Sequence, residues 1–98
     1  MHLWVVPAQV QGLWCAPGAS LEVTQRFQTF SATLTALPGT TPIRVFDGHV
    51  TGATLRAHEP AGLALSLRGR QLQLDHIVGP GADLAGRRFE RAATPACT

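Results

Sequence analysis

The histidines, acids and serines of this sequence could do chemistry, but none of them forms a motif with a known mechanism. No two of the histidines have the spacing of a zinc motif, and the cysteines form no C-x-x-C. Three of the six acids, Asp47, Glu59 and Asp83, fall in expected turns, and no serine lies in a G-x-S-x-G elbow. We therefore predict no catalytic, cofactor-binding or metal-binding residue, and no activity for this chain on its own. The four histidines are His2, His49, His58 and His76.

His76 and Gln25 are the two side chains that we single out as possible ligand or rim contacts. His76 follows Leu72 and Leu74 in an alternating run, so its side chain could face the interior of a sheet. A hydrogen-bonded core or rim histidine is the ordinary interpretation, and a ligand contact is the alternative. Gln25 continues the apolar face of an earlier alternating run.

Trp14 and Arg88 are a possible structural pair at one end of a barrel. Trp14 stands in the segment G-L-W at 12–14, and arginines occur near the last expected strand, at 87–91. Closing a barrel would bring the first and last strands together, so an arginine could stack on the indole. A G-x-W near the start and an arginine on the last strand also occur in lipocalin-like barrels.

The elements that must position these residues are short strands. Apolar and polar residues alternate with period 2 in residues 20–37, 63–68 and 71–75, and glycine or proline interrupts every long helical window. The pattern predicts an all-β fold, a small antiparallel up-and-down meander of about eight strands. The meander would form a closed or flattened lipocalin-like barrel filled mostly by side chains.

Two hairpins are expected at particular turns. The first lies near residues 28–30, with one continuous bent strand as the alternative. Asp47 and Gly48 give the second, as a two-residue turn, and Gly52 is then a bulge or a close approach within the returning strand.

The charge of the chain gives little reason to expect a nucleic-acid partner. All eight basic residues are arginine, as the codon bias of a GC-rich genome would produce, so their number is weak evidence for nucleic-acid binding. Aromatic residues make up only 6%. Arg68 with Arg70, and Arg87 with Arg88 and Arg91, are the nearest approaches to a basic cluster. A solvated strand face is the ordinary interpretation of these clusters, and a phosphate-binding patch is the alternative.

Length and hydropathy indicate one domain. The chain has 98 residues, of which 45% are hydrophobic and 14% charged, which argues against disorder. No apolar run approaches the ~20 residues of a membrane helix, and no secretory signal is evident, so we expect a cytoplasmic protein without a membrane partner. Cys15 and Cys97 could join the ends of a closed barrel, but a reducing compartment favours free thiols.

Six segments, in their order and spacing, resemble a known family. They read LWVVPA at 3–8, VQGLW at 10–14, LEVTQRFQ at 21–28, SATL at 31–34, GHVTG at 48–52 and RF at 88–89. Together they resemble the C-terminal β-rich extension of bacterial class I SAM-dependent methyltransferases. The glycine-rich SAM-binding loop of that family is absent here, so no SAM-binding residue carries over.

The resemblance implies a division of the chain and a function. Residues 1–10 would be the residual strand of an upstream methyltransferase domain, residues 11–91 a β-barrel and residues 92–98 a flexible tail. The chain would be a non-catalytic accessory or interaction domain, with SAM bound only through the missing catalytic domain. Its partner would be that domain, or a second copy through Leu3, Trp4, Val5 and Val6. A free-standing lipocalin-like barrel that binds a small ligand is the alternative.

Overall fold

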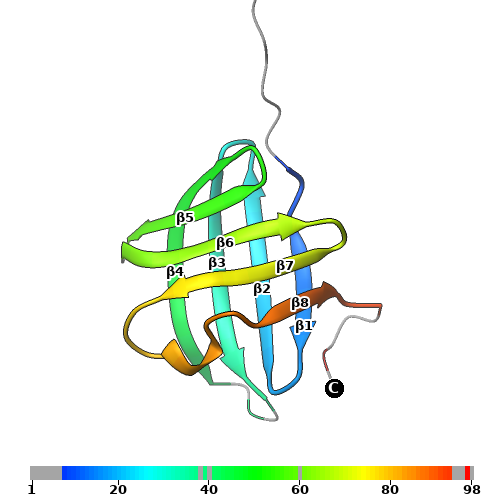
Figure 1. The fold of residues 1–98 in the computed structure, drawn as a ribbon, viewed down its shortest axis with the longest axis vertical. Coiled ribbons are helices and arrows are strands. Elements are labelled where there is room, and N and C mark those ends of the chain that lie inside the picture. Colours follow the sequence, from blue (N-terminus) through cyan, green and yellow to red (C-terminus); the bar gives the residue numbers. More distant parts are fainter. Residues whose placement is uncertain (1–7, 38, 40, 60, 94–96, 98) are drawn as a thin grey trace, which may run out of the picture.

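The chain folds as a closed barrel of eight antiparallel strands that follow one another in chain order (Figure 1). The computed structural model describes residues 8–37, 39, 41–59, 61–93 and 97. The strands are β1 (Gly12–Ala16), β2 (Ala19–Arg26), β3 (Thr29–Ala36), β4 (Pro42–Thr51), β5 (Thr54–Glu59), β6 (Ala61–Arg68), β7 (Gln71–Ile77) and β8 (Arg88–Arg91). One 3-10 turn, η1 (Ala82–Leu84), precedes β8. Because β8 pairs with β1, the sheet has no open side, and the predicted all-β up-and-down barrel is confirmed.

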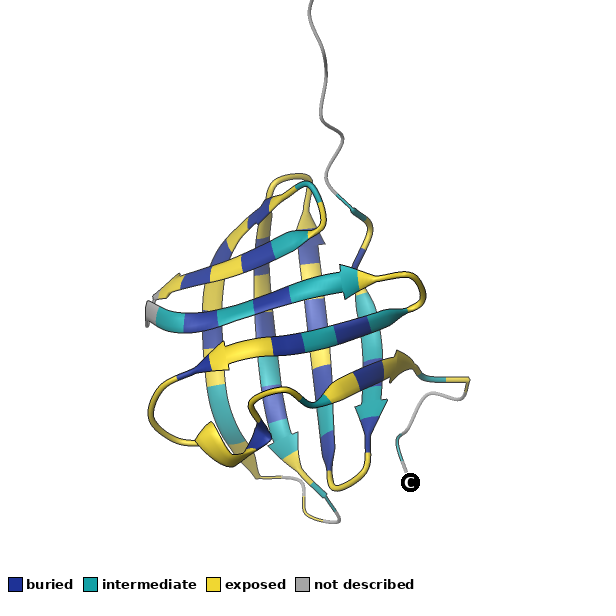
Figure 2. Cartoon of the chain, viewed as in Figure 1, coloured by how far each residue is buried: buried dark blue, intermediate teal, exposed yellow. Residues whose placement is uncertain are grey.

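The interior of the barrel is filled by apolar side chains. Buried and exposed residues alternate along the strands, as the colours of Figure 2 show. In β2, for example, Leu21 and Val23 are buried while Glu22 and Thr24 are exposed. The largest fully buried side chains are Trp14, Phe46, Phe89, Leu21, Leu34, Leu55, Leu65, Leu72, Leu74, Val10, Val23 and Val50. Because side chains fill the interior, the two barrel ends and the outer face are the places where a ligand could bind.

The first expected hairpin is present, and its turn has an unusual conformation. Arg26 of β2 pairs with Thr29 of β3, so Phe27 and Gln28 alone connect the strands. Phe27 has φ 52°, a left-handed conformation that bulky side chains rarely adopt, and it is the only such non-glycine residue in the described chain. The alternative of one bent strand is therefore wrong.

The second expected hairpin, at Asp47 and Gly48, is wrong, because β4 continues through both residues. Gly48 faces the neighbouring strand so closely that an added Cβ would lie 2.0 Å from the carbonyl oxygen of Arg56. The glycine thus serves close backbone approach at a bulge rather than a turn. The turn itself lies at Gly52 and Ala53, between the paired Thr51 of β4 and Thr54 of β5.

The expectation of free thiols is also wrong. Cys15 of β1 and Cys97 form a disulfide, with their Cα atoms 5.6 Å apart. Barrel closure explains the pair, because β8 lies beside β1 and delivers the C-terminal residues to that strand. Cys97 is therefore tied to the barrel, although it belongs to the range expected to be a flexible tail. The segment from Leu3 to Val6, which we expect to contact a partner, lies outside the described residues.

Candidate functional site

One end of the barrel is crossed by the N-terminal segment, residues 8–11. This end also carries the β2–β3, β4–β5 and β6–β7 turns, and we call it the capped end (Figure 1). The Ala8 N–H donates to the carbonyl of Gly52 in the β4–β5 turn, over 2.8 Å. The segment therefore runs from the start of β1 across to the far side of the barrel, whereas the resemblance implies that residues 8–10 belong to a strand of another domain.

Gln25, near the end of β2, holds the first part of this segment. Its side chain is only 9% exposed. Its Oε1 accepts from the Val10 N–H over 2.8 Å, and its Nε2 donates to the carbonyls of Ala8, over 2.9 Å, and Phe27, over 2.8 Å. Both amide hydrogens are thus used within the chain. The structure places Gln25 at the rim, where it binds the protein's own backbone.

Trp14 and Arg91 hold the rest of the segment. The indole is fully buried, and its Nε1 donates to the carbonyl of Val10 over 2.9 Å. The guanidinium of Arg91 lies 4.4 Å from the ring centroid and donates to the carbonyls of Gln9 and Gln11. Together with Gln25, these side chains bind every carbonyl of residues 8–11. These hydrogen bonds therefore fix the conformation of residues 8–11 at the capped end before any ligand binds.

The arginine stacked on Trp14 is Arg91 and not Arg88. In the β1–β8 pairing, Trp14 lies directly opposite Arg91, so both side chains leave the sheet on the same face. Arg88 lies three residues earlier, opposite Gln73 of β7, and is exposed. Alternation along β8 places Arg88 on the face opposite to the buried Phe89, which excludes it from the indole.

His76 does not face the interior. The β6–β7 pairing shifts register, with Leu65 opposite Leu74 and Ala64 opposite His76. This bulge adds one residue to β7, so Ile77 is buried where unbroken alternation would have buried His76. His76 is therefore exposed, and it does not lie among the residues of the pocket described next.

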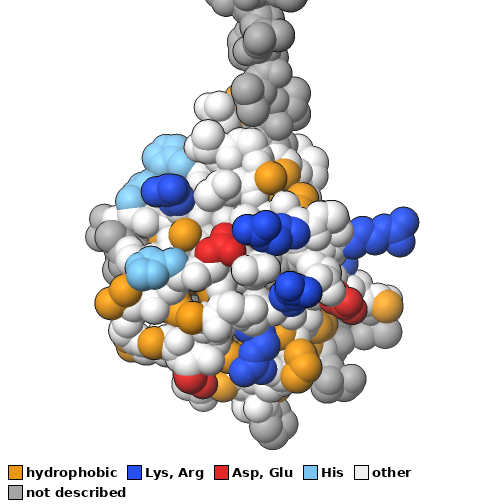
Figure 3. Space-filling view, viewed as in Figure 1, with side chains coloured by type: hydrophobic (Ala, Val, Ile, Leu, Met, Phe, Trp, Pro, Cys, Tyr) orange, Lys and Arg blue, Asp and Glu red, His pale blue; other side chains and the backbone are white. Residues whose placement is uncertain are grey.

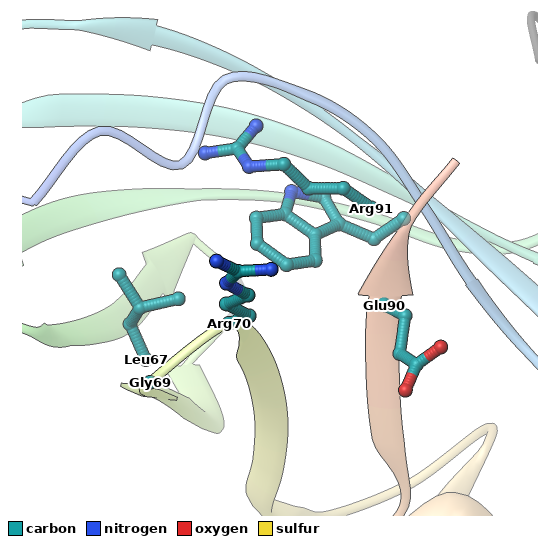
Figure 4. A pocket seen from close by; sticks show the side chains of 6 residues that line it. Leu67, Gly69, Arg70, Glu90 and Arg91 are labelled. Carbon is teal, nitrogen blue, oxygen red and sulfur yellow. The ribbon is translucent and has the colours of Figure 1, made fainter. Parts of the chain in front are cut away.

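A pocket of about 550 Å³, the arginine pocket, opens beside the capped end. It is lined by Trp14, Leu67, Gly69, Arg70, Glu90 and Arg91. Figure 4 shows Arg70 and Arg91 on the same side of β8, whereas the Glu90 carboxylate extends to the other side. The Glu90 carboxylate also accepts a hydrogen bond from Gln71, over 3.2 Å. The pocket thus presents two guanidinium groups over an apolar wall.

Neither arginine of the pocket forms an ion pair within the described part of the chain, although Glu90 in the lining offsets one of the two positive charges. Arg91 donates to backbone carbonyls, and Arg70, in the exposed β6–β7 turn, has no hydrogen bond or ion pair with a described residue. Figure 3 shows more basic than acidic side chains on the face formed by β5 to β8. Guanidinium groups bind carboxylates and phosphates through paired N–H donors. The pocket can therefore hold an anion beside an apolar group.

The sequence does not reveal this pocket, because its two arginines lie far apart in the chain. Proximity along the chain groups Arg70 with Arg68, and Arg91 with Arg87 and Arg88, as separate solvated faces or phosphate patches. Barrel closure sets the β6–β7 turn beside the end of β8, since Gln71 pairs with Glu90. A closed meander, which the sequence predicts, already implies that the β6–β7 turn lies near the end of the last strand.

Two further observations concern the whole described chain. No helix among the described residues is long and apolar enough to cross a membrane. In the same residues, no group of three or more His, Cys, Asp or Glu side chains is placed to hold a metal ion.

No protein-family model matches the chain, and neither a curated protein nor a solved structure shows a significant match to it.

Proposed function

We propose that this chain is a non-catalytic binding barrel that takes a small anionic ligand with an apolar part in the arginine pocket. The observation that carries the proposal is the placement of Arg70 and Arg91 beside Trp14 and Leu67 in a pocket of about 550 Å³. Pockets for small molecules have volumes of roughly 300–1,000 Å³ and combine apolar walls with a few polar groups. Because apolar side chains fill the interior, the proposal puts the ligand at the barrel end, unlike a lipocalin-like barrel that holds its ligand inside.

The two arginines have different roles in this proposal. Arg91 is already committed to two backbone carbonyls and the indole, so it supplies fixed positive charge with little loss of entropy. Arg70 is exposed and unpaired in the described chain, so its guanidinium is available to donate to a carboxylate or phosphate. Leu67, half-buried at the wall, would contact the apolar part.

Decanoate is a suitable probe, with decanol as its uncharged counterpart. In a Trp4→Phe background Trp14 is the sole tryptophan, and its fluorescence reports a change in Arg91 above the ring. We expect saturable binding of decanoate and much weaker binding of decanol. Arg70→Gln should weaken decanoate binding about tenfold or more, since a hydrogen bond to a charged group contributes roughly 1.5–3 kcal/mol.

Arg68→Gln is the matched control. Arg68 is exposed two residues before Arg70 but does not line the pocket. We expect it to leave the affinity for decanoate nearly unchanged. Equal binding of decanoate and decanol, or equal losses in the two variants, would remove the support for a specific anion site.

An accessory domain of a methyltransferase is the second candidate function. The resemblance of the six segments supports it, and the four carbonyls of residues 8–11 that bind barrel side chains would fix the connection to a preceding domain. Titration with S-adenosylmethionine, with sedimentation mass recorded in the same buffer, tests this candidate. It predicts no SAM binding and self-association that Trp4→Asp abolishes.

The disulfide supports an oxidising compartment for this function. The expectation of free thiols depended on a reducing compartment, whereas both cysteines of the chain are joined. Disulfides persist mainly outside reducing compartments. Alkylation of the protein in its native cells, followed by mass spectrometry without reduction, should find Cys15 and Cys97 unmodified and linked.

A further inference from the structure

Two histidines meet on the outer face of the barrel, away from the arginine pocket. His49 lies on β4 and His58 on β5, and both are exposed. The Nδ1 of His49 lies 2.8 Å from the Nε2 of His58, and the ring planes are tilted by 37° at a centroid separation of 4.7 Å. Figure 3 shows histidine side chains at the edge of the view near β5. One proton is shared between these two nitrogens, because one ring must donate and the other accept.

The two nitrogens lie close enough together to ligate one metal ion. A metal–imidazole bond is about 2.0 Å long, so two ligands at a right angle have nitrogens about 2.8 Å apart, whereas a tetrahedral site requires roughly 3.3 Å. Right-angled nitrogen ligands are typical of tetragonal Cu²⁺ and Ni²⁺. The observed 2.8 Å is the length of the hydrogen bond between the rings, and at this separation both nitrogens can reach one ion with little movement.

We propose that His49 Nδ1 and His58 Nε2 are neighbouring ligands of one Cu²⁺ or Ni²⁺ ion on the outer face of β4 and β5. The ion would replace the proton that the two rings share, and this proton would pass to solvent. Water would fill the other positions, because no third His, Cys, Asp or Glu side chain of the described chain is placed to ligate. No thiol competes for the ion, since both cysteines form the disulfide.

The backbone holds this pair in place. The β4–β5 hairpin sets His49 opposite Arg56, and the bulge at Asp47 and Gly48 brings the next outward residue, His58, beside His49. Both histidines line a groove of about 370 Å³. Asp47 and Arg26 also line that groove and add one charge of each sign. The groove leaves the open positions of the metal accessible to water or a small ligand.

The test is isothermal titration of the full chain with CuCl₂ and with NiCl₂. The parent protein of the comparison and every variant carry His2→Gln, because a histidine beside a free amino terminus binds Cu²⁺ by itself. His49→Gln and His58→Gln are the test variants, and His76→Gln, on the exposed surface of β7, is the matched control. The visible absorption of the Cu²⁺ form gives a second readout, since each imidazole nitrogen in the equatorial plane shifts the d–d band to shorter wavelength.

We expect one equivalent of Cu²⁺ to bind, and each test variant to weaken it about tenfold or more while the control leaves it unchanged. Zn²⁺ should bind more weakly than Cu²⁺ and Ni²⁺. The d–d band of the parent should lie at shorter wavelength than that of either test variant. Equal affinities in parent and test variants, or an equal loss in His76→Gln, would overturn the proposal, as would a d–d band that neither test variant changes.

Discussion

Replacing Gln25 by leucine should detach the N-terminal segment from the barrel and cost about 3 kcal/mol of stability. The change removes three side-chain hydrogen bonds, to Val10, Ala8 and Phe27. Each contributes roughly 0.5–1.5 kcal/mol, and a buried donor left unpaired costs roughly 1–3 kcal/mol. Val10 is fully buried, so its N–H has no access to water, and the leucine recovers only part of the loss through its apolar surface.

Urea unfolding, followed by circular dichroism, measures this loss as a lower midpoint with little change in slope. In a domain of this size the melting temperature should fall by roughly 4–8 °C for each kcal/mol. Hydrogen exchange should also show faster loss of protection at the Val10 amide than in the strands. Gln73→Leu is the control, on the outer face of β7 and without a hydrogen bond to a described side chain. A Gln25→Leu variant as stable as the parent, or a control that loses as much, would refute this reasoning.

Three further changes probe the barrel itself by urea unfolding. Gly48→Ala should cost about 3 kcal/mol, because the new Cβ would lie 2.0 Å from the backbone oxygen of Arg56, which cannot move aside. Phe27→Gly should stabilise by about 1 kcal/mol, because glycine adopts φ 52° without strain and the phenyl ring is 60% exposed. Replacing Cys15 and Cys97 together by serine should cost up to about 4 kcal/mol, because the disulfide closes a loop with a sequence separation of 82.

Each of these changes has its own control or contrary outcome. Gly39→Ala meets its nearest atom at 3.4 Å, so it should be far milder than Gly48→Ala. Gln28→Gly changes the neighbouring turn residue, which has no positive φ, and should destabilise rather than stabilise. Reducing agent should lower the stability of the parent and leave the double serine variant unchanged. A parent that ignores reductant would contradict the contribution assigned to the disulfide.

The barrel could be predicted because its strands obey simple alternation. Leu21 and Val23 mark the inner face of β2 without ambiguity, and Leu72 and Leu74 mark that of β7. The failures occur where a bulge breaks the alternation. One added residue in β7 turned His76 outward, and this shift depends on pairing with β6, which no local pattern reveals.

The sites escaped prediction for a related reason. A turn placed at Asp47 and Gly48 gives the wrong register for β4 and β5, so the meeting of His49 and His58 could not be foreseen. Glycine served as a turn signal there, whereas its role is close approach between strands. The stacked arginine was assigned to the right strand but to the wrong face, because alternation from Phe89 selects Arg91.

The most direct test of the proposed anion site is a heteronuclear NMR titration of the labelled chain with decanoate. We expect saturable shifts of the amides of Gly69, Arg70, Glu90 and Arg91, with one affinity shared by all four. The same shifts should be absent when decanol replaces decanoate. Shifts that fail to saturate, or that centre on residues outside the arginine pocket, would contradict the claim that this barrel end binds an anionic ligand.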